Sequence, residues 1–275
     1  MARSNPAARP AGCVSDWLFA PANPTWVAVF RVLLCLMLLV DFWPGSLVAD
    51  LPFRNSFGLE KLYEPLFLTW SYWALAAAIV VLFGAGWRPR LMGGCAVVLL
   101  FPLLFLSGSR QSRQVLWFVL IACSLLRPGG PMWPIRLIQF QLSVVYGVNA
   151  IAKTTPGYLS GEVLMGMSNA LPNFLVDLSS GYAQLWFLRM PVSMAAVLSA
   201  ATEYTLALGF WFRRTRPAAA VLGVGFHLML KQIVRIHMLD WTSMFLYLAF
   251  FLPFHTRARR DPSGTGPAES PRTSP

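Results

Sequence analysis

Four ionisable side chains interrupt long apolar runs of this sequence and could do chemistry there: Arg31, Lys153, Glu203 and His227. A charge near the centre of a bilayer costs about 2.5–3.5 kcal/mol, so in a membrane each would need a partner or a function. For Arg31 and Glu203 the simpler interpretation is an interhelical ion pair that fixes packing. For His227 it is a hydrogen bond to a backbone carbonyl. Asp41, at the end of the first apolar run, is expected to face water.

Lys153 differs from the others because of its neighbours along the chain. It ends the apolar run Val144–Ala152 and precedes Thr154–Gly157, which contains a proline and a glycine. Loss of hydration disfavours the ammonium form of a lysine. An amine that is neutral part of the time can act as a base or a nucleophile. The alternative is a snorkelling lysine whose head group reaches the interface.

Other kinds of chemistry find little support in the sequence. The four cysteines contain no Cys-x-x-Cys pair, which argues against a thiol redox centre and against a zinc site. We therefore expect no metal. The net charge of +11 comes from bases that cluster between apolar runs, as in membrane proteins, so we expect contact with membrane lipid and not with nucleic acid.

The elements that must position these residues are membrane-spanning helices. Of the 275 residues, 56% are hydrophobic and 12% are charged, against roughly 25% charged in soluble domains. The apolar runs are continuous and do not alternate, which excludes a transmembrane barrel. We predict an all-α, polytopic membrane bundle of about eight transmembrane helices, with interfacial helices over Gly161–Met190, between the fifth and sixth. The predicted spans are 25–43, 66–84, 91–107, 113–127, 137–153, 191–212, 217–236 and 241–255.

The sequence divides into a membrane domain and two polar tails. Residues 1–24 are expected to form a disordered basic N-terminal tail, 25–255 the transmembrane domain, and 256–275 a disordered C-terminal tail. With the N-terminus inside, the inner segments carry 13 lysines and arginines and the outer segments eight. Positive charge favours the cytoplasmic side. We therefore predict a multi-pass protein of the cell membrane with both termini cytoplasmic, although Arg110 and Arg113 oppose this orientation.

Two spaced motifs resemble a known family. One is Gln141-x4-Tyr146-x6-Lys153-x4-Tyr158-x2-Gly161. It resembles the core motif of the membrane domain that vitamin K-dependent γ-glutamyl carboxylases share with their bacterial relatives, the HTTM (horizontally transferred transmembrane) proteins, in which tryptophan stands at the position of Tyr158. The resemblance extends over about 25–255 and includes a second set of matching positions: Arg31, Glu203, Gly225–Met229, Gln232, Ile236 and Met238.

The resemblance implies a helical bundle with a reaction centre at its outer, lumenal face. In the carboxylases the lysine that matches Lys153 deprotonates a reduced quinone. Oxygen then converts the quinone into a strong base, which removes the γ-proton of a glutamate before CO₂ adds. The carboxylases also carry a histidine near the start of the fourth span, where this chain has Ser109–Gln111.

Two hypotheses follow for the function, and both remain open. In the first, Lys153 is a base on a reduced, vitamin K-like quinone, and His227 or Glu203 orients or pairs with the lysine. Offsets of seven and twelve residues are taken to place Tyr146 and Gln141 near the lysine face of one helix. Cofactor contacts are assigned to Gln141, Tyr146 and Tyr158. In the second, the protein is a non-catalytic membrane component of secreted-peptide maturation or export, and its partner is a secreted peptide or a soluble companion protein. A channel or carrier is least supported, because no inverted repeat is visible.

Overall fold

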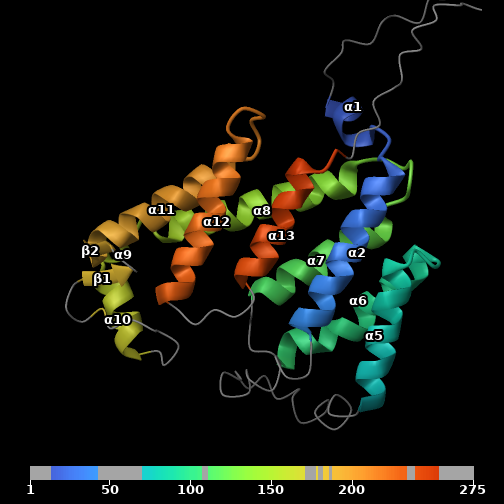
Figure 1. The fold of residues 1–275 in the computed structure, drawn as a ribbon, viewed down its shortest axis with the longest axis horizontal. Coiled ribbons are helices and arrows are strands. Elements are labelled where there is room, and N and C mark those ends of the chain that lie inside the picture. The colour runs from blue at the N-terminus through green and yellow to red at the C-terminus, as the bar shows by residue number, and fades with distance from the viewer. Residues whose placement is uncertain are drawn as a thin grey trace, which may run out of the picture.

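The structure, a computed structural model, describes residues 14–42, 70–106, 111–170, 178, 182–185, 188–233 and 239–253. It is a helical bundle, which confirms the all-α prediction (Figure 1). Within the described residues, eight helices coincide with the eight predicted apolar runs: α2 (Pro24–Asp41), α5 (Trp70–Gly84), α6 (Pro89–Leu106), α7 (Gln111–Leu125), α8 (Trp133–Ala152), α11 (Val192–Gly209), α12 (Arg216–Ile233) and α13 (Leu239–Phe251).

Three of these helices, α2, α8 and α11, are long and apolar enough to cross a membrane. The apolar stretches of the other five are shorter, at 10–17 residues. An upright crossing of the hydrocarbon core needs about 20 helical residues. The chain therefore has the helices of a membrane protein, while the total of eight crossings stays a prediction.

Helix α8 is the element that organises the candidate site. Its 20 residues include the buried side chains of Ile135, Ile138, Leu142 and Tyr146, spaced three or four apart as on one helical face. This face packs against α11, α13 and α7. In Figure 1, α8 runs along the long axis of the molecule, with α2 and α5–α7 at one end. The helix ends at Lys153, whose backbone N–H donates to the carbonyl of Asn149 at 3.0 Å.

Small residues let α6 and α7 approach closely. A Cβ atom at Gly93 would lie 2.5 Å from the Cβ of Ser124, whereas one at Gly94 would meet no atom within 4 Å. We expect Gly93→Ala to destabilise the protein by about 1–3 kcal/mol, because the helices must separate. Gly94→Ala is the matched control and should be neutral or stabilising, since alanine favours helix. Thermal unfolding in detergent measures the stability of each variant, because the buried thiols of Cys35 and Cys123 become open to labelling when the protein unfolds. Equal losses of stability in Gly93→Ala and Gly94→Ala would contradict the packing argument.

The predicted N-terminal tail is structured in its second half. Helix α1 (Val14–Phe19) precedes a short connection in which Ala22 is fully buried. The backbone N–H of Ala22 donates to the carbonyl of Gly130 at 2.7 Å, and Gly129 donates back to Ala22 at 3.0 Å. The guanidinium of Arg136 lies 4.3 Å from the ring of Trp17. The prediction of disorder is therefore wrong for residues 14–24, because backbone pairing and an aromatic contact anchor them to the bundle; residues 1–13 and 256–275 lie outside the described residues.

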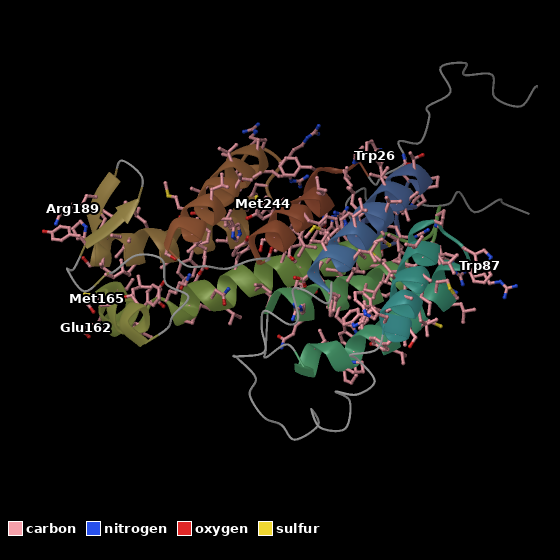
Figure 2. All side chains as sticks on the ribbon, turned by 60° about the horizontal axis from the view of Figure 1, so that its bottom comes forward. Trp26, Trp87, Glu162, Met165, Arg189 and Met244 are labelled. Atoms are coloured by element: carbon pink, nitrogen blue, oxygen red, sulfur yellow. The ribbon has the colours of Figure 1, made fainter. Side chains whose placement is uncertain are left out.

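The described residues of the segment between α8 and α11, which leave out 171–177, 179–181 and 186–187, are only partly helical. It holds α9 (Pro156–Leu159) and α10 (Glu162–Ala170), and then an antiparallel pair, β1 (Tyr182–Leu185) and β2 (Leu188–Pro191). Figure 2 shows Glu162, Met165 and Arg189 together at the end of the molecule opposite Trp87. The helical prediction for Gly161–Met190 is confirmed for α10 and is wrong for the hairpin. Its strands bury Ala183 and Met190 on one side, and such four-residue segments are too short to show a helical period.

Asp41 does not face water as the sequence suggested. Its side chain and that of Arg113 are both 0% exposed, and Nε of Arg113 lies 3.7 Å from Oδ2 of Asp41. Nη2 of Arg113 also donates to the backbone carbonyl of Asp41 at 3.1 Å. Arg113 is therefore a buried cation that joins α7 to the end of α2, and it is not one of the loop charges that set topology. When Arg113 is left out for this reason, the number of lysines and arginines in the outer segments falls from eight to seven.

Candidate functional site

Lys153 forms an ion pair with Glu203 at the end of α8. Its Nζ donates to Oε1 of Glu203 at 2.8 Å and to the hydroxyl of Ser199 at 3.0 Å. Ser199 and Glu203 are four residues apart on α11, so they share one face of that helix. The side chain of Lys153 is 21% exposed and that of Glu203 is 5% exposed. The amine is thus the accessible partner and the carboxylate the buried one.

Two aromatic rings border the ammonium group. The centroids of the Tyr158 and Phe226 rings each lie 5.7 Å from Nζ of Lys153, within the range of cation–π attraction. Tyr158 belongs to α9, which follows α8 directly, and Phe226 belongs to α12. The amine therefore lies where α8, α9, α11 and α12 meet, between one carboxylate and two apolar ring faces.

A second polar cluster lies deeper on the same helices. The hydroxyl of Tyr146 is 2.8 Å from Nε2 of His227 and 2.7 Å from the hydroxyl of Tyr247. All three side chains are buried, and they come from α8, α12 and α13. His227 and Glu203 lie within electrostatic range of each other. The two clusters are therefore neighbours.

The structure brings together most of the predicted site residues. Lys153, Glu203 and Tyr158 form the first cluster, and Tyr146 and His227 belong to the second. The structure shows the phenol of Tyr146 as a partner of His227, where the sequence suggested a backbone carbonyl.

Gln141 and Arg31 lie away from this site. Twelve residues separate Gln141 from Lys153, which is about 18 Å along the helix axis and about 120° around it. The expectation that Gln141 shares the lysine face is therefore wrong. Arg31 is buried on α2, with its guanidinium 5.6 Å from the ring of Phe83. Its Nε and Nη2 have no hydrogen-bond partner among the described residues, so the ion pair expected there is not found within them. The ion pair expected for Glu203 is the one with Lys153.

Sequence reasoning missed three residues of the site: Ser199, Phe226 and Tyr247. Ser199 could have been found, because it stands four residues before Glu203 in an otherwise apolar run. Phe226 lies within the matching stretch Gly225–Met229, but no role was assigned to it there. Tyr247 carries no signal, since its partner Tyr146 is 101 positions away.

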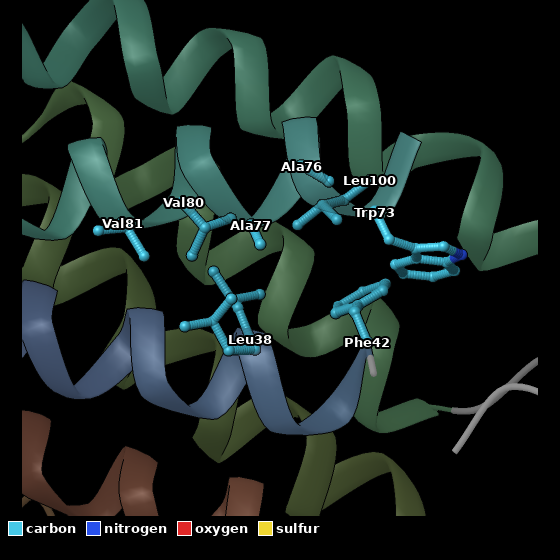
Figure 3. A pocket seen from close by; sticks show the side chains of 9 residues that line it. Leu38, Phe42, Trp73, Ala76, Ala77, Val80, Val81 and Leu100 are labelled. Carbon is cyan, nitrogen blue, oxygen red and sulfur yellow. The ribbon is translucent and has the colours of Figure 1, made fainter. Parts of the chain in front are cut away.

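A cavity of about 310 Å³ lies elsewhere, between α2 and α5. Figure 3 shows Leu38 of α2 and Phe42, which follows that helix, facing Trp73, Ala77 and Val80 of α5 across it. The described residues that line it are apolar, and none of them carries a carboxylate, an amine or an imidazole, so this part of the lining suits an apolar group. The chemistry-bearing residues lie instead at the Lys153 end of α8.

The fold and the site together define a polytopic helical membrane protein with a lysine–glutamate pair at the end of a central helix. The HTTM domain model matches residues 119–254, from α7 to just beyond α13. This part of the chain, which contains both polar clusters, belongs to the HTTM domain family and is related to the membrane domain of the carboxylases. No curated protein and no solved structure matches the chain.

Proposed function

We propose that this protein is a membrane-embedded enzyme in which Lys153 is the base for a lipid-soluble, quinone-like cofactor at the outer face of the membrane. The observation that carries the proposal is the 2.8 Å contact between Nζ of Lys153 and Oε1 of Glu203. A carboxylate with 5% exposure holds an amine that is itself partly open. Ionisable pairs that are withdrawn from water in this way concentrate at functional sites.

Glu203 provides a place for the proton that Lys153 must lose to become a base. Burial penalises both charges of an ion pair, and this narrows the free-energy gap between the charged pair and the neutral pair. Transfer of the proton from Nζ to Oε1 of Glu203 leaves a lone pair on the amine. The hydroxyl of Ser199, 3.0 Å from Nζ, then holds the amine in place. The neutral amine can accept a proton from a bound hydroxyl group.

The residues around Lys153 fit a planar, hydroxyl-bearing cofactor. Oε2 of Glu203 is buried and has no hydrogen-bond partner among the described residues, so it is available to accept from a hydroxyl group. Tyr158 and Phe226 provide aromatic faces on which a flat ring can pack. A reduced quinone bound there would supply an acidic hydroxyl group and two electrons for reaction with oxygen. Of the three residues assigned to the cofactor, Tyr158 keeps that role, whereas Tyr146 bonds to His227 and Gln141 is distant.

Oxygen-dependent consumption of reduced menaquinone by the full-length protein in lipid nanodiscs tests this function. Lys153→Arg should lower the rate by roughly 10²–10⁴-fold, the usual contribution of a general base. Arginine can keep the ion pair with Glu203 but cannot lose its proton. Lys231→Arg makes the same chemical change on α12 and should leave the rate unchanged. A Lys153→Arg variant with the full wild-type rate would remove Lys153 from the chemistry.

The same ion pair also suits the second candidate function. A lysine held by both Glu203 and Ser199 can act as a structural link between α8 and α11. The protein would then be a non-catalytic component of secreted-peptide maturation or export, and Lys153→Arg would be mild. Co-purification with a secreted peptide or a soluble companion protein would favour this function.

We place the protein in the cell membrane with both termini cytoplasmic. The burial of Arg113 supports this orientation, because it removes one of the two outer bases that opposed it.

A further inference from the structure

The turn between α11 and α12 carries aromatic and basic residues that belong to neither polar cluster. Trp211, Phe212, Arg213 and Arg214 stand within five residues of the end of α11, a helix long and apolar enough to cross a membrane. In Figure 1 this turn lies at the top of the view, on the same side as α1. A turn that follows a crossing helix reaches the lipid headgroups, the level at which tryptophan is enriched.

Side-chain hydrogen bonds hold this turn in one shape. The hydroxyl of Thr215 donates to the carbonyl of Gly209 at 2.7 Å. Nε of Arg216 donates to the carbonyl of Phe210 at 3.0 Å, and its Nη1 donates to the carbonyl of Phe250 at 2.5 Å. The guanidinium of Arg216 thus ties the turn to the end of α13. A turn fixed in this way loses little conformational freedom when it binds a partner.

The ring of Trp211 anchors the turn to three other elements. Its Nε1 donates to the hydroxyl of Ser143 on α8 at 2.7 Å. Its centroid lies 5.7 Å from that of Phe250 on α13, edge to face, and 6.1 Å from that of Trp17 on α1. Phe19, also on α1, is 62% exposed. Exposed aromatic residues of α1 therefore lie on the same face of the bundle as the turn.

The side chains that the turn presents outward are one phenyl ring and two guanidinium groups. Phe212 is 64% exposed, and Arg213 and Arg214 are both exposed. Neither of these two arginines forms an ion pair or a side-chain hydrogen bond with the described residues. Arg213 lies within electrostatic range of Arg216, and Arg216 within range of Arg136. Positive charge gathers here, so an anion would be attracted.

An anionic phospholipid matches both kinds of group. Guanidinium groups hold the oxygens of a phosphate with paired hydrogen bonds. The ring of Phe212 can lie among the acyl chains just below that phosphate. A lipid with a choline headgroup brings a cation of its own, which the arginines would repel. A free phosphate would match the arginines and leave the exposed ring in water.

We propose that Phe212, Arg213 and Arg214 form a binding site for an anionic phospholipid, with the two guanidinium groups on the headgroup phosphate and the phenyl ring among the acyl chains. Trp211 and Arg216 hold the turn in the shape that presents these groups. A lipid bound there keeps the ends of α11 and α12 at the headgroup level. The inference is independent of the proposed function, because the site contains none of the residues around Lys153.

Native mass spectrometry of the full-length protein in detergent, titrated with phosphatidylglycerol or with phosphatidylcholine, tests the proposal. The wild type should bind phosphatidylglycerol more tightly than phosphatidylcholine. Arg213→Gln/Arg214→Gln should raise the Kd for phosphatidylglycerol roughly 30-fold, about fivefold for each arginine near the surface. Phe212→Ala should weaken the binding of both lipids by about tenfold, because it removes the apolar contact that they share.

Two variants are controls for charge alone. Arg189→Gln also removes one exposed arginine, but the 18 residues of α11, about 27 Å of helix, separate it from the turn. It should leave the affinity for phosphatidylglycerol unchanged. Arg213→Lys/Arg214→Lys keeps both charges and loses the paired hydrogen bonds, so its affinity should fall between those of the wild type and the glutamine variant. Without lipid, all variants should unfold at the wild-type temperature, because the changed side chains are exposed.

Three results would overturn the proposal. The first is equal affinity of the wild type for the two lipids, and the second is an unchanged affinity for phosphatidylglycerol in Arg213→Gln/Arg214→Gln. The third is displacement of phosphatidylglycerol by an equal concentration of inorganic phosphate, which would make the turn a site for free phosphate.

Discussion

Asp41→Asn is expected to lower the free energy of unfolding by about 3–5 kcal/mol, because it removes the carboxylate charge that lies opposite the buried guanidinium of Arg113. Neither side chain of this pair has any exposure, and their charged atoms are 3.7 Å apart. Arg113→Met should cost a similar amount, since it removes the cation that lies opposite the buried carboxylate of Asp41. Removal of one partner of a buried pair is more costly than removal of both, because the remaining charge cannot reach water.

The double variant Asp41→Leu/Arg113→Met is the control for this prediction. It replaces both charges with apolar groups and should recover most of the lost stability. Labelling of Cys35 and Cys123 during thermal unfolding in detergent measures the stability of the two single variants and of the double variant, because both thiols are buried in the folded protein. Single variants that each cost less than about 1 kcal/mol would mean that water reaches the pair.

Lys153→Met is expected to destabilise the protein more than Glu203→Gln, by about 3–5 kcal/mol against about 1–3 kcal/mol. The reason is the unequal burial of the two side chains. Without its lysine, the carboxylate of Glu203 is stranded at 5% exposure. Without its glutamate, Lys153 keeps Ser199 and the two aromatic rings, and at 21% exposure its ammonium can turn toward water.

A double-mutant cycle tests this asymmetry. Lys153→Met/Glu203→Gln should be more stable than Lys153→Met alone, because no charge is left in the site. Ser199→Ala removes a neutral hydrogen bond from the same amine and should cost only about 0.5–1.5 kcal/mol. A reversed order of the two single variants would show that Glu203, and not Lys153, is the partner that reaches water.

The helices were largely predictable because they depend on local sequence. Continuous apolar runs indicated α2, α8 and α11 to within a few residues, and the three helices confirm the prediction. Local reasoning failed where backbone pairing with a distant segment decides the structure. Ala22 is ordered by hydrogen bonds to Gly129 and Gly130, more than 100 positions away, so nothing near residue 22 could have indicated it.

The sequence predicted which residues belong to the candidate site better than it predicted which of them contact one another. Lys153, Glu203 and His227 were found because a charge in an apolar run is costly and therefore conspicuous. Which of them pair was not visible, since Lys153 and Glu203 are 50 positions apart. Arg31 and Glu203 were equally good candidates for an ion pair, yet only Glu203 faces a described opposite charge.

The sequence by itself determined the kind of protein, the helices it forms and the ionisable groups they carry, because hydrophobicity and helical period act over a few turns. Only the tertiary structure decided that Glu203 pairs with Lys153, that Asp41 is buried against Arg113, and that the hydroxyl of Tyr247 lies within hydrogen-bond distance of Tyr146. The physical reason is that these contacts depend on the relative position and rotation of whole helices. Helix packing sets both, through close approaches such as those at Gly93 and Gly223.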